Sequence, residues 1–202
     1  MSGLALKHLM TPQGMDQLAA LTGGQVSPYK NPEMQGAMQA VVQQALQENP
    51  ALEKTRVTVR KNFPNAYYNV NKDEVVLGIV NPTVLAHELN HADSLQQDGL
   101  YRKVLQIAHG ISKLNTYAAL PTVLALRTFV KDKDRRDDIL KTLSAVSAAA
   151  AAPGLVEEAS ASIGAIKDSP NKFDAIRTLG PGFLAHMASG MTPSLVYQAG
   201  RM

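Results

Sequence analysis

The period of the apolar residues changes at Pro82, and this change limits what the chain can fold into. Before Pro82, three short runs rich in β-branched and aromatic residues predict strands, with residues 71–73 as a turn between the last two. From Pro82 to the end the pattern is helical. The sequence therefore predicts an α+β fold that is mostly helical, with a small β-sheet followed by a helical bundle. The three predicted strands cover residues 55–61, 66–70 and 74–80.

Proline, glycine and asparagine residues predict where the helices begin and end. Asn31 is suited to cap a helix that starts at Pro32 and ends before Asn49. Asn81 is suited to cap a second helix, which we expect to run from Pro82 to about Gln97. The later helices are predicted to break at glycines and prolines. These positions are Gly99, Gly110, Pro121, Pro153-Gly154, Pro170, Pro181 and Pro193.

Composition excludes some classes of protein. With 202 residues, 45% hydrophobic and 18% charged, the chain can bury a core. Its net charge is only +3, and the 20 basic residues are scattered, so nucleic-acid binding is not indicated. There is no cysteine, so any metal ion must be held by histidine or carboxylate ligands. The first residues do not resemble a secretory signal, and we expect a cytoplasmic protein.

Two apolar stretches, 114–130 and 139–156, lie on either side of the charged run 131–138. Each is shorter than the roughly 20 residues that a membrane-spanning helix needs, and Pro121, Arg127 and Lys141 interrupt them. We expect two helices packed in a hairpin within a soluble domain. A hairpin that associates peripherally with a membrane is the alternative that the sequence leaves open.

The stretch HELNH places His87 and His91 four residues apart on the predicted helix 82–97. Side chains with this spacing share one helix face, so both imidazoles can reach one ion. A catalytic zinc site needs three protein ligands and an open position for water. Glu88, next to the first histidine, has the position of the general base in this motif. The pattern therefore predicts a zinc site with His87 and His91 as ligands and Glu88 as the catalytic residue.

The third ligand has to come from elsewhere in the chain. Gln97 stands where a metzincin would carry its third histidine, so that form is excluded. The acidic candidates on a later helix are Glu157 and Glu158, which face about 100° apart. Glu158 lies nearer to the predicted apolar face, and we expect it to lean inward while Glu157 is solvated. That face consists of Leu155, Val156, Ala159, Ile163 and Ile166. Alternatively, both acids stabilise the start of a helix through its dipole.

The order of these features resembles the gluzincin metallopeptidases, and within them the HtpX and CAAX prenyl protease type. The likeness covers residues 31 to 168. The run NAYYNVNKDEVVLGIV resembles the part of that family that precedes HExxH, and EASAS resembles its third-ligand pattern. The resemblance implies a zincin-like core and Glu158 as third ligand. It also implies that residues 74–80 form a sheet edge onto which an extended substrate adds.

The chain departs from that family in two places. Ser162 stands where the family has an aspartate that supports a ligand histidine, so the support is expected either from a weaker hydroxyl contact or from elsewhere in the chain. The C-terminal element that stabilises the oxyanion has no match. His186 and Tyr197 are candidate donors in this tail, although packing or surface roles are the simpler interpretation. Asp93 is either a second acceptor near His91 or an exposed helix carboxylate.

These patterns together predict three segments. They are an N-terminal segment at 1–30, a zincin-like domain at 31–168 with a helical hairpin inserted at 103–153, and a C-terminal helical tail at 169–202. We expect zinc-dependent hydrolysis of peptide or protein substrates, as an endopeptidase more than an exopeptidase. The alternative is a non-catalytic structural or membrane-associating helical protein that has kept the ligands of a degenerate zincin.

Overall fold

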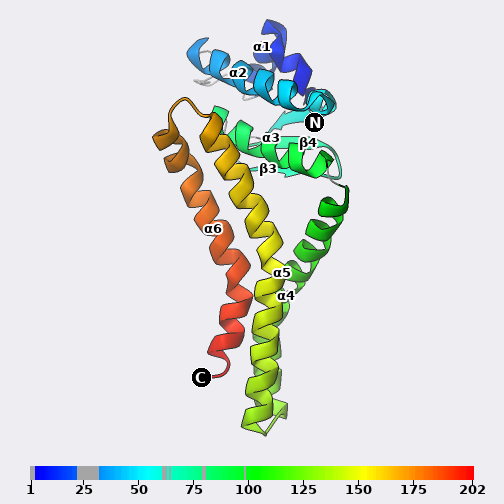
Figure 1. The fold of residues 1–202 in the computed structure, drawn as a ribbon, viewed down its shortest axis with the longest axis vertical. Helices are drawn as coiled ribbons and strands as arrows, with labels where there is room; N and C mark the ends of the chain where they lie inside the picture. Colours follow the sequence, from blue (N-terminus) through cyan, green and yellow to red (C-terminus); the bar gives the residue numbers. More distant parts are fainter. Residues whose placement is uncertain (1–2, 22–31, 61–62, 64, 79–80, 98) are drawn as a thin grey trace. The chain divides into compact units, whose positions relative to one another are not determined.

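The fold was obtained as a computed structural model, in which the described residues are 3–21, 32–60, 63, 65–78, 81–97 and 99–202 (Figure 1). The chain divides into two compact units. The first comprises Met1–Asp98 and Ser160–Gly180, and the second comprises Gly99–Ala159 and Pro181–Met202. The described part is mostly helical with a small mixed sheet, which confirms the α+β class. The predicted boundaries at 30, 103–153 and 168 stay predictions.

The sheet of the first unit has four strands in the order β1-β2-β4-β3. Strands β3 and β4 pair antiparallel and form the predicted hairpin, and β2 and β4 pair in parallel. Asp73, in the turn between β3 and β4, has a φ of 46°, a left-handed conformation that aspartate tolerates better than most residues. The strands are β1 (Leu4–Ala5), β2 (Arg56–Val59), β3 (Ala66–Asn69) and β4 (Glu74–Leu77).

Two features of the sheet differ from the sequence prediction. Strand β4 was expected at an edge, but it pairs with β2 on one side and β3 on the other, so the described edge next to it is β3. Strand β1 was not predicted, because two residues carry too little periodicity to be recognised. The parts of the predicted strands at 61 and 79–80, and the predicted cap Asn31, lie outside the described residues.

The core of the first unit lies between its sheet and its helices. Leucine, valine and methionine side chains from η1, α1, α2, η3, α3 and the sheet form one cluster, in which Leu85 and Leu89 of α3 are buried. Helix α3 matches its predicted range, and its apolar side packs on the sheet and on α2. These elements are η1 (Leu6–Met10), α1 (Pro12–Leu21), α2 (Pro32–Glu48), η3 (Pro50–Lys54) and α3 (Pro82–Gln97).

Helix α5 (Lys133–Asp168) brings its last turns into the first unit, followed by the start of α6 (Lys172–Ala199). Ala165 of α5 is buried with Ala86 of α3 and with Leu179 of α6. A Cβ atom on Gly164 would lie 2.6 Å from the Oδ1 atom of Asn90, so α5 approaches α3 closely only because residue 164 has no side chain. This contact sets the distance between the two helices.

The second unit is built from α4 (Gly99–Phe129) and from parts of α5 and α6. Its apolar cluster joins Ala119 and Val123 of α4, Leu140 of α5 and Tyr197 of α6. The expected packing of the two apolar stretches against each other is therefore present. Between α5 and α6, the hydroxyl groups of Ser144 and Ser194 lie 2.8 Å apart, both buried, and Gln198 donates to Ser144. Figure 1 shows the three long helices of this unit.

Several predicted helix breaks are wrong. Pro121 lies inside α4, Pro153 inside α5, and Pro181 and Pro193 inside α6. A proline inside a helix removes one backbone hydrogen bond and costs about 3 kcal/mol, which bends a helix without necessarily ending it when both sides are packed. Among the predicted proline breaks, Pro170 does separate two helices. Because α5 continues through Pro153, the two glutamates stand in mid-helix and not at a helix start.

The predicted apolar face of α5 is also wrong. Val156 and Ile163 were expected to point inward, but they are 63% and 66% exposed. The buried face of α5 consists instead of small and polar residues with one leucine. These residues are Leu140, Ser144, Ser147, Ala151, Glu157, Glu158, Ala161, Ser162 and Ala165. Glu158 was therefore predicted on a helix-face argument that the structure contradicts.

Gly164→Val should destabilise the first unit, since its side chain would have to displace Asn90, which donates to the carbonyl of Ala86. We expect a loss of about 1–3 kcal/mol in the free energy of unfolding, measured by urea denaturation. Asn90→Ala in the same chain should recover part of the loss. Gly154→Ala is the control, because a Cβ there meets nothing within 4 Å. A Gly164→Val protein as stable as the control would contradict the close contact.

Candidate metal centre

Helix α3 presents two histidines on one face because its start is defined by a side-chain cap. The side chain of Asn81 accepts a hydrogen bond from the backbone N–H of Thr83 at 2.8 Å, as predicted for the cap. The helix then runs without a break through His87 and His91. Their Nε2 atoms lie 3.1 Å apart and their rings are perpendicular. This agrees with the expectation that two ligands of one ion lie within about 4 Å.

The other ring nitrogen of His87 faces α5. Its Nδ1 atom lies 3.3 Å from the Oγ atom of Ser162, and both residues are buried. When Nδ1–H donates to this hydroxyl, Nε2 keeps the lone pair that a metal ion requires. Ser162 thus makes the hydroxyl contact, one of the two alternatives that the sequence left open in place of an aspartate.

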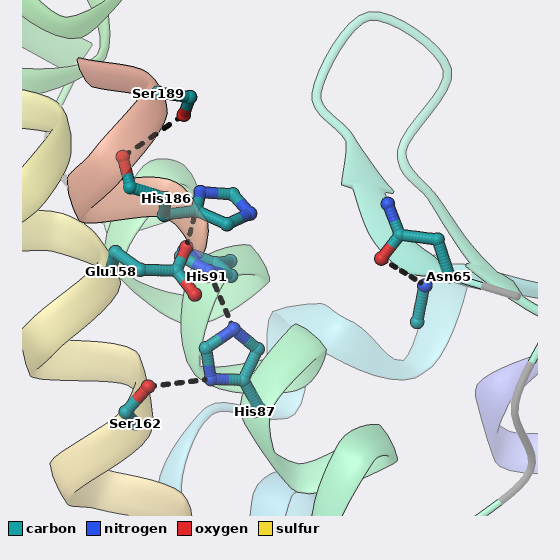
Figure 2. Close-up of polar contacts among 8 residues, drawn as sticks. Asn65, His87, His91, Glu158, Ser162, His186 and Ser189 are labelled. Carbon is teal, nitrogen blue, oxygen red and sulfur yellow. Dashed lines mark hydrogen bonds and ion pairs between the residues drawn. The ribbon is translucent and has the colours of Figure 1, made fainter. Parts of the chain in front are cut away.

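Glu158 reaches the histidines along α5. It stands one turn before Ser162 on the same continuous helix, so the contact of Ser162 with His87 also directs Glu158 toward this face. One ligand atom from each of His87, His91 and Glu158 lies within 4.8 Å of the other two. Figure 2 shows the Glu158 carboxylate next to the ring of His186. The three residues predicted as ligands are brought together.

Glu157 was predicted to be solvated, and this is wrong. It is only 6% exposed, and the Tyr101 hydroxyl donates to its Oε2 atom at 2.8 Å. Burial of Tyr101, together with its hydrogen bond to this carboxylate, raises the pKa of the phenol to about 12. Tyr101 therefore stays a hydrogen-bond donor throughout the neutral range. Sequence reasoning missed Tyr101, since nothing links it to a residue 56 positions away.

The two candidate donors of the C-terminal tail differ. His186 Nδ1 lies 3.4 Å from Glu158 Oε2, and its side chain is 58% exposed (Figure 2). Tyr197 is fully packed in the apolar cluster of the second unit, so it has the packing role that was the simpler interpretation. Asp93 is half-buried and accepts a hydrogen bond from the side chain of Asn49 at 2.8 Å, which connects α3 to the end of α2.

Glu88, the predicted general base, is buried at 5% exposure on α3. A buried carboxylate follows His87 directly in sequence, and a second, Glu158, lies within reach of both imidazoles. Burial makes these negative charges costly without a compensating positive charge. The same burial would strengthen any interaction between them and a cation.

The donor set fits a small divalent metal ion. Two imidazole nitrogens and one carboxylate oxygen form one of the ligand sets that hold zinc in cysteine-free catalytic sites, and each would lie about 2.0–2.2 Å from the ion. Ligand atoms bound to one ion at that distance stand about 3–4 Å from one another. The 3.1 Å between the two imidazoles and the 4.8 Å limit for all three require only small side-chain adjustments. His87, His91 and Glu158 could therefore hold zinc.

Comparison of the chain with protein-family models, with curated proteins and with solved structures gives no significant match.

Exchanging the two adjacent glutamates separately tests which carboxylate belongs to the centre. We expect Glu158→Gln to weaken zinc binding by at least tenfold, because it removes one of three ligands. Glu157→Gln should keep zinc binding within a few-fold and change stability instead, through its contact with Tyr101. Competition with a chromophoric chelator measures both affinities. Loss of zinc by the Glu157 variant alone would show that the other carboxylate is the ligand.

Proposed function

We propose that this protein is a zinc-dependent peptidase of the gluzincin kind, with His87, His91 and Glu158 as ligands and Glu88 as general base. The observation that supports the proposal best is the cluster of these three ligand residues. Within it, His91 of α3 and Glu158 of α5 are 67 positions apart in sequence. By themselves, two histidines four residues apart make up only a short motif and only two of the three ligands. A buried carboxylate from a distant helix at the same point is the third ligand that such a site requires.

The chemistry assigned to the residues follows from their groups. Bound zinc would supply a Lewis acid and lower the pKa of water to about 7. Glu88 accepts a proton from the attacking water as the new carbon–oxygen bond forms. It then returns that proton to the nitrogen as the peptide bond breaks and the amine leaves. Ser162 holds His87 in orientation through Nδ1, and His186, beside Glu158, is placed to donate to the oxyanion.

The substrate would bind as an extended strand. Strand β3 pairs with β4 on one side, and among the described strands it stands at the end of the sheet. An edge strand offers unpaired backbone donors and acceptors to an extended peptide. The sequence predicted that β4 forms the substrate-binding edge, and we now propose β3 for this role. A substrate bound there would be an internal segment of a chain. This supports endopeptidase over exopeptidase activity.

A second candidate function is a zinc site without catalysis. The observation in its favour is His186, which lies 3.4 Å from Glu158 and is able to become a fourth ligand. Four protein ligands close a zinc site, and closed sites are structural. In that case His186→Ala should open the site and weaken zinc binding, whereas in the peptidase it should lower turnover and leave zinc in place.

Glu88→Gln tests the peptidase proposal directly. We expect the variant to keep one zinc per chain, because Glu88 is not a ligand, and to lose hydrolysis by about 10²–10⁴-fold, because the base is gone. Zinc is measured by elemental analysis and hydrolysis with a library of internally quenched peptides. Glu53→Gln, an exposed carboxylate that pairs with Lys7, is the control and should match the unaltered chain. If the unaltered chain binds zinc and cleaves nothing, the non-catalytic function is correct.

A further inference from the structure

We propose that the second unit is embedded in a lipid bilayer, with its exposed apolar side chains against the hydrocarbon. The starting point is α5, which among the described residues is the helix long and apolar enough to cross a membrane. The core helix of a soluble protein would pass that test too, but it would be mostly buried. Only 22% of the apolar window of α5 is buried.

The second observation is that large apolar side chains are exposed on α4 and α6 as well. Aqueous monomers rarely expose many large apolar side chains side by side, and such surfaces mark contact with another apolar phase. Here they recur along α4 and α6, each more than half exposed. Six of them are Leu114, Tyr117, Leu120, Leu124, Leu184 and Leu195.

Charge is distributed as a bilayer would require. No lysine, arginine, aspartate or glutamate occurs in 114–126 of α4, in 142–156 of α5 or from residue 178 to the end of α6. At 1.5 Å per residue these stretches measure roughly 20, 22 and 33 Å. Lys113, Arg127 and Lys141 border the two shorter stretches, and long basic side chains next to a membrane extend toward the headgroups. When the length of these basic side chains is added, the lengths of the charge-free stretches approach the thickness of the hydrocarbon core, which is roughly 30 Å.

Several polar groups within these stretches have partners inside the protein. The exposed hydroxyls of Thr116 and Thr192 donate to backbone carbonyls one turn earlier in their own helices, at 2.9 and 2.7 Å. Ser144, Ser194 and Gln198 bond to one another across α5 and α6. Helices in lipid satisfy hydroxyl groups in these two ways, since no water is available. The buried side of α5 is small and polar while its exposed side carries Val146 and Val156, the reverse of an aqueous helix.

This proposal departs from the hairpin in a soluble domain that the sequence suggested. The sequence interpretation counted uninterrupted apolar length in single helices. The structure adds that the apolar side chains are on the outside. The proposal does not depend on the zinc centre or on catalysis.

The first experiment is flotation of the full chain with phosphatidylcholine vesicles after detergent removal. We expect the protein to float and to stay bound through strong salt and alkaline carbonate washes. Leu195→Glu should lower the floated fraction about tenfold or more, because a carboxylate would face hydrocarbon. Ile176→Glu is the matched control on the same helix, 53% exposed against 56% for Leu195, but outside the second unit. It should float like the unaltered chain.

A milder pair of variants tests the same point if Leu195→Glu fails to fold. The chain has no tryptophan, so Leu195→Trp and Ile176→Trp each report one position. In vesicles of brominated phosphatidylcholine, the Leu195→Trp emission should be blue-shifted and quenched, and the Ile176→Trp emission should not. Equal emission from both, or release of the chain by salt, would overturn the proposal. A detergent-free dimer that buries residue 195 would overturn it too, by assigning the surface to a second copy of the chain.

Discussion

The candidate site depends on one packing contact, the close approach of α5 to α3 at Gly164. Helix α3 carries both histidines, and by itself it would offer two ligands. The absence of a side chain at residue 164 lets α5 lie against Asn90, and Ala165 then packs against Ala86. That placement brings Ser162 within reach of His87, and one turn earlier it brings Glu158 to the same face. A larger residue at 164 would have to displace the Asn90 side chain or shift α5 away from α3.

The sequence predicted α3 well because its signals are local. A capping asparagine, a proline at the first helical position and two histidines one turn apart all act within sixteen residues, and the structure reproduces each of them. The hairpin of β3 and β4 was predictable for the same reason. For Ser162 the sequence left open whether its hydroxyl or another group contacts a ligand histidine, and the structure shows the hydroxyl of Ser162 3.3 Å from His87. Glu158 lies within 4.8 Å of both histidines, so its role as third ligand stays a prediction, and the helix-face argument behind that prediction was wrong.

The failures concern α5 and the sheet edge, where the outcome depends on distant parts of the chain. Pro153 was expected to end a helix, but packing on both sides of it keeps α5 continuous. The apolar side of α5 that the sequence period identified is its exposed side. A period shows which residues share a helix face, and it does not show whether that face is buried. The first unit buries leucine, valine and methionine, whereas the second buries alanine and serine beside a few larger residues. A single rule for which residue types are buried could therefore not describe both units.

The electrostatics of the site follow from burial. Glu88, Glu157 and Glu158 are all less than 10% exposed, and burying a carboxylate costs free energy that hydrogen bonds or a nearby positive charge must offset. Glu157 has the Tyr101 hydroxyl, a neutral donor whose raised pKa keeps its proton in place. Glu158 faces three imidazoles, those of His87, His91 and His186. A divalent cation held by His87, His91 and Glu158 would use imidazole lone pairs and the carboxylate charge at once, so this combination of groups could hold a metal ion.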